Sequence, residues 1–424
     1  MNEQGRDRNS GVTSRKTILI LSDGYLPGFK SGGPVRTLAN MIAVFGDEFA
    51  FKVVTPDRDL GSCEPYEGIK TNEWQRVGKA EVWYVSPGGM SLAFVRQIIN
   101  TTQHDLLYLN SFFSPRFTIQ PLLLRLMGLV KRAPTIIAAR GELSQGALKI
   151  KSFKKHLYLQ AAMHTGLYRG LVWRASSAYE KDDIVRVAGK GLPDSAVPVV
   201  IAPNIAHCDT SPQEGVRQDK RPGSLRVVFL SRLSPKKNLD GALSMLRGLK
   251  GDVVFDIYGP LEDSGYWRSC QEIVRTLPAS VRVNYQGTVG HDEVAEVYSR
   301  YDLFLFPTRG ENFGHVIIEA LVAGCPIVVS DQTPWRGLHE KGVGWDLPLD
   351  RPERFTTVLQ QCVDMGPDDM RALSQRARAY GLQNATDPDK VRQNRHLFTF
   401  AMQYRPDDSS AECGEAGEGD YGDR

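Results

Sequence analysis

The sequence predicts an α/β protein of two domains, each with a mostly parallel β-sheet. Its length is the first reason, because 424 residues are too many for one hydrophobic core. The second is the repeated order of apolar strand and helical segment, which is typical of parallel sheets with crossover helices. The third is that this order restarts after a polar, turn-rich stretch at residues 206–224. We therefore expect one domain on each side of that linker.

The first domain is predicted to span residues 15–205. Its first strand, residues 17–21, is apolar without alternation, as expected of a strand buried on both faces. A Gly32-Gly33 pair separates it from a helical run at residues 35–44. The remaining strands are expected at residues 51–55, 81–85, 106–109, 135–138 and 199–202. Residues 1–14 are polar and are expected to be disordered.

The second domain is predicted to span residues 225–385. A strand at residues 225–230 opens it, and a helix is expected to follow and end near Leu249. Further strands are expected at residues 253–258, 281–285, 303–306 and 327–329, with a short one near 342–345. Residues 386–404 are predicted to hold the last helix. The end of the chain, 405–424, is rich in Asp and Glu and is expected to be a disordered acidic tail.

Composition excludes several classes of protein. The net charge is only +3, and no ribbon of interleaved basic and aromatic residues indicates nucleic-acid binding. The six cysteines form no C-x-x-C pair, so neither a zinc site nor a disulfide framework is indicated. The N-terminal residues lack the apolar core of a signal peptide, and no run approaches ~20 apolar residues. We expect a cytoplasmic protein in a reducing compartment.

Two glutamates flank the start of the helix expected after strand 303–306. Glu311 belongs to the loop at the carboxyl end of that strand, and Glu319 lies one to two turns into the helix. Between them, the helix N-terminus favours an anion, and Gly314 lets a phosphate come close. A nucleotide sugar could span this set, with a hydroxylated group at each glutamate and phosphates between them. Solvated glutamates in an ordinary strand–helix unit are the alternative.

Two cations lie in the loop after strand 225–230. Arg232 and Lys237 have four residues between them. At the carboxyl edge of a parallel strand, such a pair can neutralise a diphosphate leaving group. A basic loop without a ligand is the alternative. Gly32 and Gly33, which precede a helix in the first domain, are further candidates for close approach to a phosphate.

These motifs resemble a known family. Glu311 and Glu319 are separated by seven residues, which include Phe313-Gly314, and Ala320-Leu321 follows. This pattern resembles the E-x7-E signature of retaining family 4 glycosyltransferases. Arg232 and Lys237 resemble the Arg-x4-Lys motif of the same family, in the same chain order. The resemblance is strongest over residues 225–330 and weaker over 17–205. It implies the GT-B fold, in which two Rossmann-like domains face each other across a cleft and the last helix crosses back to the first domain.

The resemblance also implies roles for single residues. Arg232 and Lys237 would stabilise the leaving diphosphate and Glu311 would hold the donor sugar, which makes these three the predicted catalytic residues. Glu319 would bind the ribose. The other predicted donor-binding residues are Gly32, Gly33, Gly259, Gly287, Val289, Asn312, Phe313, Gly314, His315 and Val316. No metal and no cofactor are expected beside the nucleotide sugar, which is a co-substrate.

One position departs from the family pattern. Arg140 stands where many members carry a histidine close to the donor sugar, followed here as there by a glycine. Arg140 is therefore open to three interpretations: it binds a phosphate, binds an anionic acceptor, or pairs with an acidic side chain. Asn110 ends the preceding strand and is expected at the same edge. These two residues are the candidates for acceptor or cleft contacts.

The implied activity is transfer of a hexose from a nucleotide-diphosphate sugar to a hydroxyl of a glycan or lipid-linked acceptor, in surface polysaccharide biosynthesis. A basic helix, expected from Ala147, includes the Lys149–Lys155 region. That region is either an ordinary solvated face or a peripheral contact with the anionic inner face of the plasma membrane. Two other classes stay open, a GT-B nucleotide-sugar epimerase and a non-catalytic subunit that binds sugar nucleotides.

Overall fold

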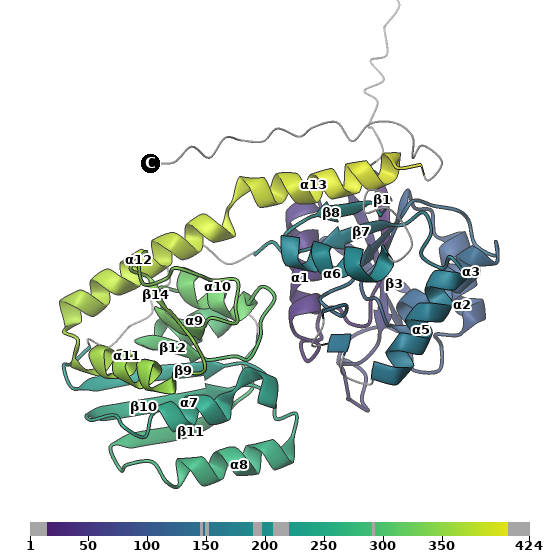
Figure 1. Cartoon of the computed structure of the whole chain (residues 1–424). Coiled ribbons are helices and arrows are strands. Elements are labelled where there is room, and N and C mark those ends of the chain that lie inside the picture. The colour runs from purple at the N-terminus through teal and green to yellow at the C-terminus, as the bar shows by residue number, and fades with distance from the viewer. Residues whose placement is uncertain are drawn as a thin grey trace, which may run out of the picture.

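The computed structural model describes residues 15–144, 147–148, 152–189, 197–206, 220–290 and 293–405. Within these ranges the chain forms two α/β domains, drawn in purple to teal and in green to yellow in Figure 1. The predicted disordered N-terminus, most of the predicted linker and the acidic tail after Arg405 lie outside the described residues. The predicted fold class, two domains with mostly parallel sheets, is confirmed.

The first domain is built on an eight-stranded sheet with the order β3-β4-β2-β1-β5-β6-β7-β8. All neighbours pair in parallel except β3 and β4, which are antiparallel. The order reverses at β1 and β5, so the loops that follow these two strands open side by side. The strands are β1 (Thr17–Leu21), β2 (Ala50–Pro56), β3 (Trp74–Val77), β4 (Ala80–Val85), β5 (Leu106–Leu109), β6 (Thr135–Ala138), β7 (Val172–Ala175) and β8 (Val199–Ile201).

Helices cover both faces of this sheet because its strands are apolar on both sides. Along β1, Ile18 and Ile20 belong to one core cluster, while Leu19 and Leu21 belong to the cluster on the opposite face. Of the predicted basic helix, residues 147–148 and α5 from Ser152 are helical, and residues 149–151 lie outside the described ranges. The helices are α1 (Gly33–Phe45), α2 (Leu92–Thr101), α3 (Gln120–Leu126), α5 (Ser152–His164) and α6 (Ala178–Ala188), with a π-helical turn at Pro115–Ile119.

The second domain has a six-stranded, all-parallel sheet with the order β11-β10-β9-β12-β13-β14. The order reverses between β9 and β12, which places the loops after these strands next to each other. The strands are β9 (Ser224–Leu230), β10 (Asp252–Tyr258), β11 (Val281–Gly287), β12 (Leu303–Phe306), β13 (Ile327–Ser330) and β14 (Gly344–Leu347).

The helix that was expected to end near Leu249 ends at Met245, and tighter turns follow it, in which the Leu246 N–H donates to the carbonyl of Leu243 and the Leu249 N–H to that of Leu246. The start of the helix is also set apart from the loop before it. A 3-10 turn, Pro235–Lys237, comes first, and Asn238 then takes a left-handed conformation with φ of 63° before α7 begins. A residue in that conformation cannot continue a helix, so α7 is a separate element. The helices of this domain are α7 (Leu239–Met245), α8 (Ser264–Val274), α9 (Val294–Ser299), α10 (His315–Val322) and α11 (Pro352–Asp364).

The last two helices connect the domains. Figure 1 shows α12 (Pro367–Ala385) lying on the second domain and α13 (Pro388–Gln403) continuing onto the first. In α13, Leu397 and Phe398 are fully buried in a core cluster of the first domain. The Asn394 amide donates a 2.7 Å hydrogen bond to the carbonyl of Pro203. None of the helices in the described ranges combines the length and the apolar character that crossing a bilayer requires.

Candidate active site

A cleft of about 550 Å³ lies between the two domains, where the loops at the carboxyl ends of both sheets meet. All but two of the predicted site residues line it. From the first domain these are Gly32, Gly33 and Arg140, and from the second they are Arg232, Lys237, Gly259, Val289, Glu311, Asn312, Phe313, Gly314, His315, Val316 and Glu319. The interdomain cleft that the resemblance implied therefore exists, and residues from both domains form its walls.

The loop before α10 turns sharply at Gly314. This residue has φ of 78° and ψ of 66°, and a β-carbon there would lie 2.7 Å from the Cδ1 atom of Ile317. Only glycine meets both conditions without strain. The turn directs the start of α10 into the cleft, where the first N–H groups of a helix have no acceptor within the helix. These groups and the helix dipole can bind an anion such as a phosphate.

Hydrogen bonds join the loop that carries Lys237 to the loop that carries Glu311. The Asn238 amide donates to the carbonyl of Pro307 over 2.7 Å, and the Arg309 N–H donates to the carbonyl of Lys236 over 2.9 Å. This arrangement brings Lys237 Nζ within 2.5 Å of Glu311 Oε2. The Lys237 side chain is only 11% exposed, so its ammonium group is held in one place at the cleft wall.

Arg232 lies where the first domain approaches the second. Its Nη1 atom forms a 2.8 Å ion pair with Glu262. Across the cleft, a β-carbon at Gly32 would lie 3.5 Å from Arg232 Nε. Gly32, after β1, and Arg232, after β9, thus lie almost in contact across the domain boundary. A diphosphate bound beside them in the cleft would contact both domains.

Helix α1 supplies two site residues that the sequence analysis did not identify. Thr37 Oγ1 lies 2.9 Å from His315 Nε2, and Arg36 Nε lies 3.5 Å from Glu319 Oε1. Burial raises the pKa of Glu319 to about 7, and the charge of Arg36 offsets part of that rise. Lys236 and Glu180 also line the cleft and were not predicted. Arg36, Thr37 and Glu180 belong to the site through tertiary packing, and no local motif marks them, whereas Lys236 lies beside Lys237 in the predicted loop.

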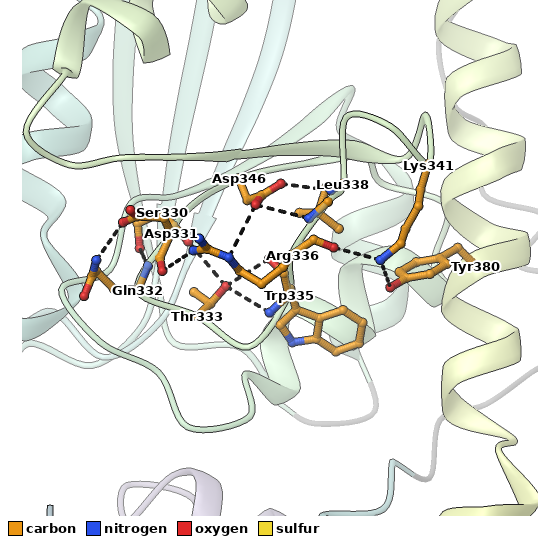
Figure 2. Close-up of polar contacts among 11 residues, drawn as sticks. Ser330, Asp331, Gln332, Thr333, Trp335, Arg336, Leu338, Lys341, Asp346 and Tyr380 are labelled. Atoms are coloured by element: carbon orange, nitrogen blue, oxygen red, sulfur yellow. Dashed lines mark hydrogen bonds and ion pairs between the residues drawn. The ribbon is translucent and has the colours of Figure 1, made fainter. Parts of the chain in front are cut away.

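The loop after β13 packs against the residues that precede α10 and is hydrogen-bonded to them. Trp335 is 7% exposed, and its indole N–H donates a 2.6 Å hydrogen bond to the carbonyl of Phe313. Figure 2 shows how the loop is held, with Arg336 between Asp331 and Asp346 and the Trp335 indole near Tyr380 of α12. Trp335 is therefore a positioning residue for the loop that carries Glu311 and Gly314.

Two predicted residues do not line the cleft. Asn110 is 4% exposed and lies behind Arg140, whose Nε and Nη2 atoms donate to its side-chain oxygen over 2.9 and 2.5 Å. Asn110 thus orients Arg140. The carbonyl of Gly287 accepts a hydrogen bond from the Gly259 N–H over 2.8 Å, which places Gly287 in support of Gly259. Within the described ranges, no three His, Cys, Asp or Glu side chains gather as a metal site would require.

Part of the chain matches a known protein family. Residues 213–380 match the model of the family described as glycosyl transferases group 1. This segment includes the loops that carry Arg232, Lys237, Glu311 and Glu319. It ends within α12, so the match covers most of the second domain.

Curated relatives match over parts of their length. The GtfA subunit of a UDP-N-acetylglucosamine–peptide N-acetylglucosaminyltransferase from Streptococcus agalactiae is 27% identical over 146 residues, 32% of this chain and 28% of that protein. The O-antigen chain mannosyltransferase B of Escherichia coli is 22% identical over 185 residues, 42% of this chain and 47% of that protein. The chain thus spans less than a third of the first of these relatives and about half of the second.

Solved structures match over nearly the whole chain. Anabaena HepE in complex with UDP and glucose has a TM-score of 0.63 at 17% identity, covering 91% of this chain and 100% of that one. Sucrose-phosphate synthase from Thermosynechococcus elongatus has a TM-score of 0.64 at 13% identity, covering 91% and 98%. At these identities the likeness shows a shared fold, with both domains and the cleft between them.

Proposed function

Because this chain has the GT-B fold of glycosyltransferases and its residues 213–380 match the model of the glycosyl transferases group 1, we propose that it is a retaining glycosyltransferase. It would move a hexose from a nucleotide-diphosphate sugar to a hydroxyl of a glycan or lipid-linked acceptor. One observation carries the proposal: two cations that follow β9 and two glutamates, one before α10 and one within it, line a single cleft together with the start of that helix.

In this proposal each group acts on a different part of the donor. The N-terminus of α10, Arg232 and Lys237 stabilise the negative charge that develops on the leaving diphosphate. Glu311 accepts hydrogen bonds from sugar hydroxyls, and Glu319 accepts them from the ribose. The bond between the anomeric carbon and the phosphate oxygen breaks, and the acceptor oxygen bonds to the same face. The acceptor proton passes to the leaving phosphate oxygen, so the step requires no protein nucleophile and no metal.

The first test is a thermal-shift panel of UDP, GDP and their sugars. A ligand that binds only the folded protein raises the free energy of unfolding by about 2.7 kcal/mol at 100 times its Kd. We expect the nucleotides of one base to stabilise the protein, and we expect Glu319→Ala to raise the Kd of those nucleotides at least tenfold. HepE was solved with UDP and glucose, so uridine nucleotides are the first choice. A panel in which no nucleotide stabilises the wild type would contradict the donor site.

Product analysis then separates this activity from its alternatives. A retaining transferase gives a linkage with the anomeric configuration of the donor, which proton NMR coupling constants report. Inversion would refute the retaining mechanism. An epimerase would change the sugar of the nucleotide without an acceptor, and a non-catalytic subunit would bind the donor and leave it unchanged.

We also propose that the first domain docks on the inner face of the plasma membrane, where lipid-linked acceptors would be held. Large apolar side chains are exposed on α5, where Phe153 is 79% and Leu157 60% exposed, and on α3 and just after it, at Leu126 and Met127. Lys154, beside them, is exposed. The predicted Lys149–Lys155 face is only partly available, since Lys155 turns inward to the carbonyl of Ala147, and residues 149–151 lie outside the described ranges.

Vesicle co-sedimentation tests the docking. We expect the protein to bind phosphatidylglycerol vesicles and not phosphatidylcholine vesicles, because exposed apolar groups beside cations suit an anionic bilayer. Phe153→Glu should lower the partition coefficient at least tenfold, since burying a phenylalanine contributes roughly 1.5–3 kcal/mol. Tyr179→Glu is the matched control, because Tyr179 is 84% exposed on α6. Equal binding of both vesicle types, or an equal loss in the control, would contradict docking through α5.

A further inference from the structure

Two arginines at the first-domain wall of the cleft share one neutral acceptor. Arg140 follows β6, and Arg174 lies on β7 with 2% exposure. Both donate to the side-chain oxygen of Asn204, Arg140 through Nη1 over 3.4 Å and Arg174 through Nη2 over 3.0 Å. Arg174 Nη2 also donates to the carbonyl of Pro203 over 3.4 Å, and its Nε atom is buried without a hydrogen-bond partner in the structure described.

The other partners of Arg140 are also uncharged. Besides Asn110, its Nη2 atom donates to the hydroxyl of Tyr108 over 3.3 Å. Among the described residues, no carboxylate forms an ion pair with either arginine. The backbone of Arg140 has φ of 54°, a conformation that non-glycine residues adopt rarely, so the guanidinium is held at this place against a backbone preference.

Two carboxylates lie near Arg140, but both already have partners of their own. Glu180 accepts from the N–H groups of Gly141 and Ser176 over 2.5 and 2.7 Å, and from the Ser176 hydroxyl. Glu142 accepts from the N–H groups that follow β5, the nearer at 2.7 Å. These carboxylates therefore balance the local charge at a distance and leave the guanidinium groups without a direct counter-ion.

Such an arrangement is costly in the absence of a ligand. Arg174 is buried and Arg140 half-buried at the cleft, and a cation that is removed from water without a paired anion loses hydration and gains little in return. Burial, together with the charge of Arg174, lowers the pKa of Arg140 to about 10, so Arg140 remains a cation near neutral pH and cannot relieve the cost by losing its proton. An incoming anion would relieve it, and Arg140 and Asn204 both line the cleft through which the anion would arrive.

The position relative to the second domain identifies which end of the substrate meets Arg140. A β-carbon on Gly141 would lie 2.0 Å from the side-chain nitrogen of Asn312, so the loop of Arg140 packs directly on the residue after Glu311. In the proposed function Glu311 holds the donor sugar, whereas Arg232 and Lys237 hold the phosphates. Arg140 therefore lies at the sugar end of the cleft.

We propose that Arg140, with Asn204 and Arg174 behind it, forms a subsite for a sugar carboxylate, so that one sugar in the reaction is a hexuronate. The proposal rests on the proposed function and specifies its substrate class. The Nε and Nη2 atoms of Arg140 are held by Asn110 and Tyr108, so a carboxylate would bind through Nη1, whose one hydrogen bond among the described residues is the 3.4 Å contact with Asn204. A phosphate, with up to two negative charges, would be repelled more strongly by the nearby Glu180. The carboxylate belongs either to the transferred sugar or to the acceptor sugar.

Matched ligand pairs distinguish the two sources by isothermal titration. In the donor arm the probes are UDP-glucuronate and UDP-glucose, or the pair with the base that the nucleotide panel selects. In the acceptor arm they are methyl glucuronide and methyl glucoside, added to protein saturated with the nucleoside diphosphate. We expect one arm to show at least tenfold tighter binding of the uronate, because a hydrogen bond between charged groups is stronger than one between neutral groups.

Arg140→Gln should abolish that preference and leave the Kd of the bare nucleoside diphosphate within about twofold. Arg140→Lys, which keeps the charge but not the hydrogen bonds that fix the guanidinium, should retain part of the preference and serves if the glutamine variant does not fold. Equal binding within both pairs by the wild type, or a preference that survives in Arg140→Gln, would overturn the inference. Binding of the bare nucleotide separates the two hypotheses, since its absence in the wild type would contradict the proposed function itself.

Discussion

Replacing Lys237 with alanine is expected to lower kcat by about 10²–10³-fold, the range observed when one group that stabilises a developing negative charge is removed. The ammonium group lies 2.5 Å from Glu311 and at the wall of the cleft. Without it, the diphosphate loses a cation and also faces a carboxylate whose charge is no longer balanced. The effect should therefore appear in kcat and in the affinity for the nucleoside diphosphate product.

A double-mutant cycle sharpens this test. Because Lys237 and Glu311 are in direct contact, the losses from Lys237→Ala and Glu311→Gln should not multiply in the double variant. Lys250→Ala is the matched control, since Lys250 is an exposed lysine of the same domain, outside the cleft. Thermal unfolding of each variant separates loss of turnover from loss of fold. A kcat within about fivefold of the wild type would refute the role of Lys237.

The second large effect concerns Glu319 and pH. Its pKa rises from 4.5 to about 7 on folding, so between these values the folded protein keeps a proton that the unfolded chain releases. The contribution of Glu319 to stability should therefore fall as pH rises from about 4.5 to 7, and then level off. At about 1.4 kcal/mol for each pKa unit, the total loss is about 3 kcal/mol. Glu319→Gln, which does not titrate, should lack this loss.

Urea unfolding at pH 4.5, 6, 7 and 8 measures the difference between the two proteins. The free energy of unfolding of Glu319→Gln, relative to that of the wild type, should increase as pH rises. Nucleotide affinity should respond in the opposite sense, because the ionised carboxylate is the better acceptor for ribose hydroxyls. Glu272→Gln, an exposed change on α8, is the control. Parallel pH profiles for wild type and Glu319→Gln would show that Glu319 ionises normally.

The fold could be predicted largely because parallel strands buried on both faces leave continuous apolar runs in the sequence. Two strands left no such signal. In β3, Trp74–Val77, polar residues interrupt the apolar ones, and the strand exists through antiparallel pairing with β4 at the sheet edge. In β7, Arg174 interrupts an otherwise apolar segment. Its burial depends on Asn204, thirty positions later in the chain, which no local pattern reveals.

The site divides in the same way. Residues on loops after β9 and β12 could be placed from the sequence, because strand order alone brings those loops together. Arg36 and Thr37 could not, since their contacts with Glu319 and His315 depend on how one domain packs against the other. Asn110 was expected at the cleft because it ends a strand. The sequence gives no indication that Arg140 would cover it.

The return of α13 to the first domain has a consequence for synthesis on the ribosome. Phe398 packs against Phe45, Phe49 and Phe51, so the earliest domain to emerge completes its core only with one of the last helices. At ~5–20 residues per second, the interval between the end of the first domain and the appearance of Phe398 is roughly ten to forty seconds. During that time Phe45, Phe49 and Phe51 lack the ring of Phe398 that contacts all three in the folded protein, so we expect them to be more exposed on the nascent chain. The second domain, whose sheet is complete by β14, has no such delay.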